Sequence, residues 1–321
     1  MEPRPQPVSC AGRAGEVVLN NKLDLHLISM TLNLKNMNEF GGNWTEKKIE
    51  ILVEYAGAYL NIMNVYAQKY SWKLLYFDGF AGSGEIIQVI DDKLAGHFDV
   101  NFTIGAARRI VELETPRPFD EYYFVEKDAK NFAELEKNTK LAFPKKKIFA
   151  VQDDCNKKMV DLANFLRNPK NKNYKTLAYI DPCGMQVEWR SIESLRGLPI
   201  DMWVLVPTGL GVNRLLKRNG EISDAWMEKL EKFLGLEKEQ IESHFYKKQQ
   251  TLFGDFTLKI EDAISKSAKL YHNRLKDVFE HVSNGFELKN SANSIMYHLF
   301  LASNNHTAFK IANDIVKKYN S

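Results

Sequence analysis

The stretch Leu74-Leu75-Tyr76-Phe77-Asp78-Gly79-Phe80-Ala81-Gly82-Ser83-Gly84-Glu85 decides how the rest of this chain is interpreted. Its first four residues are all apolar or aromatic, so both faces of the segment suit burial, as in a central strand of an α/β sheet. Asp78 ends this run, and three glycines follow within six residues. Glycine permits backbone angles closed to other residues and lets a ligand approach the main chain. The stretch therefore predicts a buried strand followed by a ligand-binding turn.

Two phosphate-binding motifs compete for this turn, and neither fits. A P-loop needs Lys and then Ser or Thr after its last glycine, but Glu85 and Ile86 stand there. A dinucleotide fingerprint needs a third glycine at the proper interval after Gly84, and none follows. The pattern Asp-x-x-x-Gly-x-Gly at a strand end instead resembles the first motif of class I S-adenosylmethionine-dependent methyltransferases. The resemblance implies a cofactor-binding role for Asp78, Gly79, Phe80, Ala81, Gly82, Ser83 and Gly84. A tight turn without a ligand remains the alternative.

Length and composition bound the class of protein. The chain has 321 residues, of which 44% are hydrophobic and 26% charged, enough for one large domain with a helical insertion. It has no run of about 18 apolar residues, so no membrane span is expected. The first five residues lack the apolar core of a secretion signal, so we expect a cytoplasmic protein.

Cysteine usage and net charge exclude further classes. Cys10, Cys155 and Cys183 form no Cys-x-x-Cys pair, which argues against a disulfide framework and against a self-contained zinc site. The seven histidines show no metal-ligand spacing either, so no metal site is predicted. A formal net charge of +3 gives no strong electrostatic case for a nucleic-acid partner.

The remainder of the chain divides into an arm and a domain. Residues 1–36 are rich in proline at their start and poor in periodic pattern, which predicts a disordered arm. Residues 37–321 would form one methyltransferase-like domain, in which residues 45–68 have the apolar spacing of a helix. Residues 86–103 show no convincing periodicity, which predicts a long connection fit to act as a lid. Residues 221–282 predict a helical subdomain.

Two further strand-like segments end in acidic residues. The segment 121–125 is followed by Glu126, which is well placed to accept hydrogen bonds from both ribose hydroxyls of a nucleoside. Capping of the following helix is the alternative role for Glu126. The segment 147–152 is followed by Asp153 and Asp154, one of which would bind an adenine amino group. The sequence does not choose between these two, and both can simply be solvated.

A fourth segment, 176–180, ends in Asp181-Pro182-Cys183-Gly184. An aspartate at the carboxyl edge of a central strand points into the crevice where open α/β sheets bind ligands. Asp181, with the Pro182 carbonyl as a second acceptor, would there orient a substrate nitrogen. A purely structural turn is the alternative. Cys183 follows a proline, as does the nucleophile of cytosine C5 methyltransferases, but a small buried cysteine filling the turn is the preferred interpretation.

Taken together, the strand-end acids resemble motifs I to IV of a class I methyltransferase. More narrowly, Phe40–Lys48, Asp78–Gly84, Phe124–Asp128 and Ile180–Gly184 resemble the three-Cys-motif partner family over roughly residues 39–319. The family name implies a companion protein with a cysteine cluster. The broader resemblance implies a Rossmann-like, mostly parallel, doubly wound sheet that binds S-adenosylmethionine. Gly184 stands where amino-directed nucleic-acid methyltransferases have a base-stacking aromatic residue, which puts stacking from this motif in doubt.

These patterns give a leading hypothesis and two rivals. The leading one is an S-adenosylmethionine-dependent methyltransferase acting on nucleic acid or a related molecule, with Asp181 and Pro182 at the acceptor. The first rival is a non-catalytic partner of a cysteine-cluster protein that keeps the fold. The second is a magnesium-dependent nuclease or hydrolase using Asp78, Glu126 and Asp181.

Overall fold

Strand β1 (Lys73–Asp78) lies inside an eight-stranded sheet in the computed structural model, which describes residues 43–92, 97–217, 221–251 and 254–320. Within those residues the strand order is β10-β12-β7-β6-β1-β4-β5, and β11 pairs with β12. The other strands are β4 (Glu121–Glu126), β5 (Ile148–Gln152), β6 (Tyr174–Ile180), β7 (Ile200–Val206), β10 (His281–Val282), β11 (Phe286–Lys289) and β12 (Ile295–Ser303).

The sheet is mostly parallel. Strands β5, β4, β1, β6 and β7 run in one direction, and β12 is antiparallel to β7. Strand β10 is antiparallel to β12, so it shares the direction of the parallel set. This is the strand order of the Rossmann-like class I methyltransferase fold, and the predicted α/β fold class is confirmed.

The order of the strands creates a switch point beside β1. From β1 the chain adds β4 and then β5 on one side, and it afterwards returns to add β6 and β7 on the other side. Open α/β sheets bind ligands at the carboxyl ends of the strands where the order reverses. The fold therefore directs attention to the residues that follow β1 and β6.

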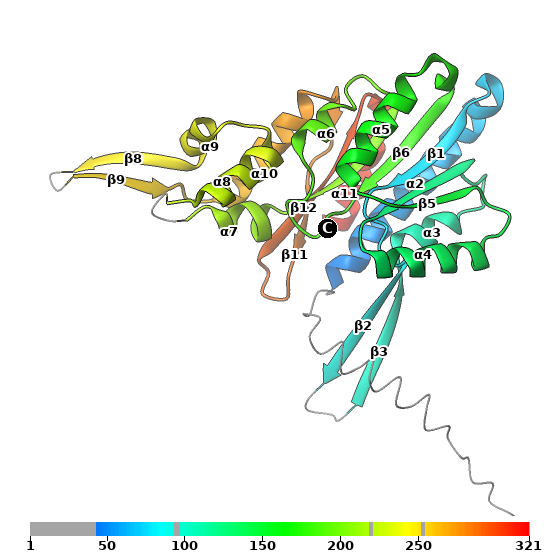
Figure 1. Cartoon of the computed structure of the whole chain (residues 1–321), viewed down its shortest axis with the longest axis horizontal. Helices are drawn as coiled ribbons and strands as arrows, with labels where there is room; N and C mark the ends of the chain where they lie inside the picture. Colours follow the sequence, from blue (N-terminus) through cyan, green and yellow to red (C-terminus); the bar gives the residue numbers. More distant parts are fainter. Residues whose placement is uncertain (1–42, 93–96, 218–220, 252–253, 321) are drawn as a thin grey trace, which may run out of the picture. The chain divides into compact units, whose positions relative to one another are not determined.

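Helices cover both faces of the sheet (Figure 1). One face packs against α5 (Cys155–Arg167), α6 (Trp189–Glu193), α8 (Asp224–Leu234), α9 (Lys238–Phe245) and α10 (Ala263–Lys276). The other packs against α2 (Asn43–Tyr70), α3 (Ala106–Val111), α4 (Ala129–Ala142) and α11 (His306–Asn320). Alternate residues of β1 serve the two layers, because Leu75 and Phe77 join the first core and Leu74 and Tyr76 the second. The described residues also contain the short helical turns η1 (Pro169–Asn171), η2 (Thr208–Val212) and α7 (Asn213–Leu215).

The segment after the glycine-rich turn differs from its prediction. The structure forms an antiparallel hairpin there, from β2 (Glu85–Asp92) and β3 (His97–Ile104), so the prediction of an irregular connection is wrong. The signal was present in Phe98, Val100, Phe102 and Ile104, which alternate with polar or small residues as a strand requires.

The segment 221–282 has the predicted helices α8, α9 and α10, but it also contains a hairpin that was not expected. Strands β8 (Tyr246–Thr251) and β9 (Gly254–Lys259) pair antiparallel between α9 and α10. The segment that follows β7 forms a π-helical turn, η2 (Thr208–Val212). The predicted arm, residues 1–36, lies outside the described residues.

Candidate functional site

The glycine-rich turn after β1 is held by both neighbouring strands. The amide of Gly79 donates to the Tyr179 carbonyl of β6 at 2.9 Å, and the amide of Ala81 donates to the Val125 carbonyl of β4 at 3.0 Å. The turn thus closes over the switch point instead of projecting from it. A loop fixed at both sides is a preorganised surface for a ligand.

The glycines of this turn are required for different reasons. A Cβ on Gly79 would lie 2.5 Å from the Cys155 sulfur, so close packing excludes a side chain there. Gly82 and Gly84 have φ angles of +62° and +81°, which strain other residues. A Cβ on Gly82 would meet nothing within 4 Å among the described atoms. The main chain is therefore open at Gly82, where a ligand can approach.

The Asp78 side chain is almost fully buried, with 1% of the residue exposed. One carboxylate oxygen accepts a hydrogen bond from the Phe80 amide at 3.0 Å, and the other faces the Tyr76 hydroxyl at 3.4 Å. Burial raises the pKa of Asp78 to about 7 against the Phe80 hydrogen bond, and the negative charge of Asp181 adds to the rise. Asp78 therefore shapes the turn and also places a titratable charge beneath it.

Glu126, at the end of β4, joins the turn directly. Its Oε2 accepts from the Gly82 amide at 2.9 Å and its Oε1 accepts from the Asp128 amide at 2.7 Å. Each carboxylate oxygen can accept a second hydrogen bond, so the group retains capacity for a diol. The alternative that Glu126 caps the next helix is wrong, because the side chain of Asp128 caps α4.

The two acids after β5 both have local partners. Asp153 accepts from Lys157 at 2.8 Å and lies 3.2 Å from Lys158, and the Lys157 hydrogen bond lowers the pKa of Asp153 to about 2. Asp154 is the N-cap of α5 and pairs with Lys127 at 3.0 Å. The role of either one at an adenine stays a prediction.

Asp181 ends β6, next to the turn after β1. Its Oδ2 accepts from Lys48 Nζ at 2.6 Å and from the Tyr179 hydroxyl at 3.0 Å. The two charged side chains are only 10% and 16% exposed, so solvent screens the pair weakly. No hydrogen bond to Oδ1 occurs within the described part of the chain, so that atom retains its capacity to accept one.

Lys48 is the residue of this site that sequence reasoning missed. It reaches Asp181 from the first turns of α2, across 133 positions of sequence. The available signal was its place on the apolar stripe of that helix, three residues after the buried Thr45 and four before the buried Leu52. A lysine in such a stripe needs a buried partner, because an unpaired buried charge is costly.

The turn after Asp181 corrects one prediction. Pro182 is buried, but Cys183 is exposed and does not fill the turn. The turn is held by the Tyr297 hydroxyl on the Cys183 carbonyl at 3.3 Å and by the Cys183 amide on Gln186 at 3.0 Å. Partial desolvation and the charge of Asp181 raise the pKa of the Cys183 thiol. Since the thiolate is the nucleophile, these surroundings disfavour covalent catalysis by Cys183.

His298 is buried, and its Nδ1 lies 2.8 Å from the Thr208 hydroxyl. In the described ranges, no group of three or more His, Cys, Asp or Glu side chains is arranged to hold a metal ion. The magnesium-dependent hydrolase therefore has no ligand cluster to build on there. None of the described helices has an apolar stretch sufficient to cross a bilayer.

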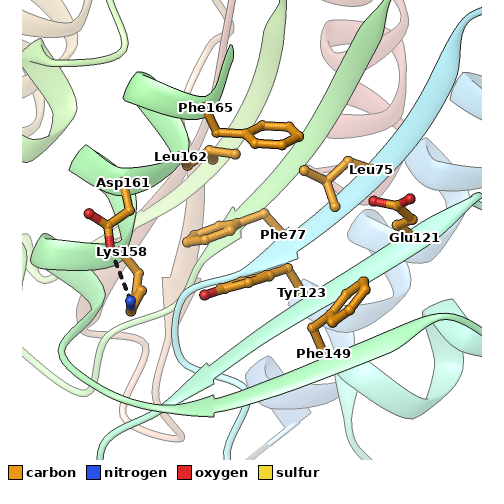
Figure 2. A pocket seen from close by; sticks show the side chains of 9 residues that line it. All are labelled: Leu75, Phe77, Glu121, Tyr123, Phe149, Lys158, Asp161, Leu162 and Phe165. Carbon is orange, nitrogen blue, oxygen red and sulfur yellow. Dashed lines mark hydrogen bonds and ion pairs between the residues drawn. The ribbon is translucent and has the colours of Figure 1, made fainter. Parts of the chain in front are cut away.

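A separate hollow lies beside the sheet edge. Figure 2 shows side chains of β1, β4 and β5 facing those of α5 around a cavity of about 340 Å³. The Lys158–Asp161 ion pair, 2.9 Å long, stands at its wall. The lining is mostly apolar and includes none of the predicted site residues: Leu75, Phe77, Glu121, Tyr123, Phe149, Lys158, Asp161, Leu162 and Phe165. This hollow is thus distinct from the candidate site.

Comparisons with known proteins gave only distant likenesses. No protein-family model and no curated protein matches the chain, so the resemblance to the three-Cys-motif partner family stays a prediction. Among solved structures, protein LPL1258 from Legionella pneumophila is 13% identical, with a TM-score of 0.42 and coverage of 83% of this chain and 91% of that one.

Several of the similar solved structures are described as methyltransferases or bind S-adenosyl-L-methionine. Trm1 from Pyrococcus horikoshii, in complex with S-adenosyl-L-methionine, is 14% identical, with a TM-score of 0.34 over 81% of this chain and 64% of that one. An S-adenosylmethionine-dependent methyltransferase from Clostridium acetobutylicum is 8% identical, with a TM-score of 0.36 over 88% and 100%. At these scores the likenesses carry no argument about function.

Proposed function

We propose that this protein is an S-adenosylmethionine-dependent methyltransferase acting on nucleic acid or a nucleic-acid-related molecule. The observation that carries the proposal is the gathering of acids at consecutive strand ends around a switch point. Asp78 follows β1, Glu126 follows β4, and Asp181 follows β6, with the backbone of the glycine-rich turn bonded between them. Ligands of open α/β sheets bind at this position.

The chain's own groups fit the parts of this cofactor. The open backbone at Gly82 admits the amino-acid portion, and the Asp78 carboxylate beneath the turn attracts its ammonium group. Glu126 has free acceptor positions for the ribose hydroxyls, and Asp153 or Asp154 is assigned to the adenine amino group. When bound, S-adenosylmethionine supplies a methyl group on a positively charged sulfur.

Asp181 would orient the methyl acceptor. Its free Oδ1 accepts a hydrogen bond from the acceptor's N–H, which aims the nitrogen lone pair at the methyl carbon, and the Pro182 carbonyl is the second acceptor. The bound cofactor would supply the methyl group to that lone pair and would keep the electron pair of the broken carbon–sulfur bond. The nitrogen then loses its proton to Asp181 or to water. Lys48 and Tyr179 hold the carboxylate in place during this step.

Calorimetric titration with S-adenosylmethionine and S-adenosylhomocysteine tests the proposal. We expect the wild type to bind both ligands and Glu126→Ala to bind neither measurably, because the ribose loses its partner. Asp78→Asn keeps the shape of the buried group and should weaken binding by removing its charge. The matched control is Glu136→Ala, a partly exposed acid of α4 that pairs with Lys140 away from the strand ends.

Circular dichroism would show that each variant is folded. Absence of binding by the folded wild type, alone and with a candidate companion protein, would overturn the proposal. Binding without any methyl transfer to nucleic acids would favour the non-catalytic partner instead.

A further inference from the structure

Lys48 brings a positive charge into an acidic site. Among the described residues of the site, Asp78, Glu126 and Asp181 contribute three carboxylates, and Lys48 lies 2.6 Å from one of them. We propose that Lys48 sets the charge of this site and thereby its preference between the positively charged methyl donor and the neutral product; this inference rests on the proposed function.

The Lys48 charge is poorly screened. The residue is 8% exposed, and its ammonium group lies against a carboxylate that is itself mostly buried. The ion pair of Lys127 with Asp154 differs in this respect, since the Lys127 side chain is 77% exposed. A charge in a weakly solvated position acts over a longer distance than one at the surface.

The charge also lies close to the cofactor turn. Strands β1 and β6 are parallel neighbours, with Asp78 opposite Tyr179 in register, so Asp181 is only two residues beyond that level. The Tyr76 hydroxyl donates toward Asp78, and the Tyr179 hydroxyl donates to Asp181. Tyr76 and Tyr179 lie on the neighbouring strands β1 and β6, so their hydroxyl groups connect to the two acids on the same side of the sheet. Removing the Lys48 charge should therefore change the electrostatic potential at the position expected for the sulfonium.

The methyl donor and its product differ by one positive charge. S-Adenosylmethionine has a sulfonium and S-adenosylhomocysteine a neutral thioether, while both share the amino acid, ribose and adenine. With Lys48 in place the three carboxylates are offset by one ammonium. This partial neutralisation limits the attraction for the donor, and removing it should increase discrimination against the product.

The test is the ratio of dissociation constants, product over donor, by calorimetry at pH 7.5. We expect Lys48→Met to raise this ratio on the order of tenfold and Asp181→Asn to lower it by a similar factor. The double variant Lys48→Met/Asp181→Asn removes both charges and should return close to the wild-type ratio. Cancellation of this kind distinguishes an effect of charge from a general loosening of the site.

The matched control is Lys318→Met. Lys318 also forms an ion pair with α2, to Glu54 at 2.8 Å, but its side chain is 64% exposed. The Lys318→Met variant should have the same product-over-donor ratio of dissociation constants as the wild type. If Lys48→Met does not fold, Asp181→Asn and the neutral double variant still measure the ratio.

The outcomes separate the two claims. If the folded wild type binds neither ligand, the proposed function fails. If it binds both and the ratio is the same in the wild type, Lys48→Met and Asp181→Asn, the function stands and the role of Lys48 is overturned.

Discussion

Two aspartates of adjacent strands, Asp181 partly buried and Asp201 buried, differ in how their carboxylates are partnered. Asp181 follows the carboxyl end of β6, whereas Asp201 lies near the start of β7 and is 7% exposed. Asp181 has a lysine partner, and within the described residues no hydrogen bond reaches its Oδ1. Both oxygens of Asp201 are taken by hydroxyl groups, Oδ2 by Tyr55 and Oδ1 by Ser303.

The difference lies in how each carboxylate is stabilised. Burial raises the pKa of Asp201 even though Ser303 and Tyr55 donate to it, because hydroxyl groups offset only part of the lost hydration. Asp181 instead has the full charge of Lys48 beside it. A carboxylate with a cation and one free oxygen is available to a ligand, whereas one filled by hydroxyls only links elements of the core.

Neutralising Asp181 is the strongest test of the proposed difference between Asp181 and Asp201. We expect Asp181→Asn to reduce methyl transfer by about 10²- to 10⁴-fold, because the amide cannot accept the proton of the acceptor nitrogen. The measurement is transfer of labelled methyl groups to bulk RNA and DNA. Asp161→Asn, a surface change with a 52% exposed side chain, is the control and should retain activity. Turnover equal to wild type in Asp181→Asn would remove this residue from the chemistry.

The second prediction concerns Asp201 and stability. Asp201→Ala leaves the Tyr55 and Ser303 hydroxyls buried without their acceptor and opens a cavity, so we expect a loss of about 3 kcal/mol in the free energy of unfolding. Urea denaturation measures it. Asp201→Asn retains an acceptor and should cost less, about 1 kcal/mol. The folded variants should bind S-adenosylmethionine as the wild type does, and a selective loss of binding would contradict the structural role.

The strand ends were predictable because their signal is local. Each combines an apolar run with an acid and a turn residue, as in Leu74–Gly84, so the positions of Asp78, Glu126 and Asp181 followed from adjacent residues. The strand order then brought them to one edge of the sheet. The hairpin β2–β3 was also a local pattern, and its alternation at 98–104 was overlooked.

The partners of these acids were not predictable in the same way. The contact of Lys48 with Asp181 spans 133 positions and that of Tyr55 with Asp201 spans 146, so neither follows from spacing. The exposure of Cys183 was mispredicted for a related reason. A Pro-Cys-Gly turn does not say which side of it faces the core, and only the packing of Tyr297 and Gln186 against the backbone decides this.

Asp78 extends the comparison of Asp181 with Asp201, because it is buried more deeply than Asp201 yet lies at the glycine-rich turn of the candidate site. Its pKa of about 7 is above the ordinary value for an aspartate, so the folded protein without ligand holds the Asp78 proton more tightly than the unfolded chain does. This proton binding stabilises the fold fully below the unfolded pKa, and the contribution is lost as the pH rises through about 7. A cationic ligand prefers the ionised form. Binding of S-adenosylmethionine should therefore tighten as the pH rises through this range.

Between pH 5.5 and 7.0 we expect affinity to increase about tenfold, while the ligand's own amino group stays protonated. Calorimetry across this range measures the effect, and buffers of different ionisation enthalpy count the proton released. Asp78→Asn should bind more weakly but with little pH dependence. An unchanged pH profile in this variant would mean that another group titrates, and that Asp78, like Asp201, serves only to hold the fold together.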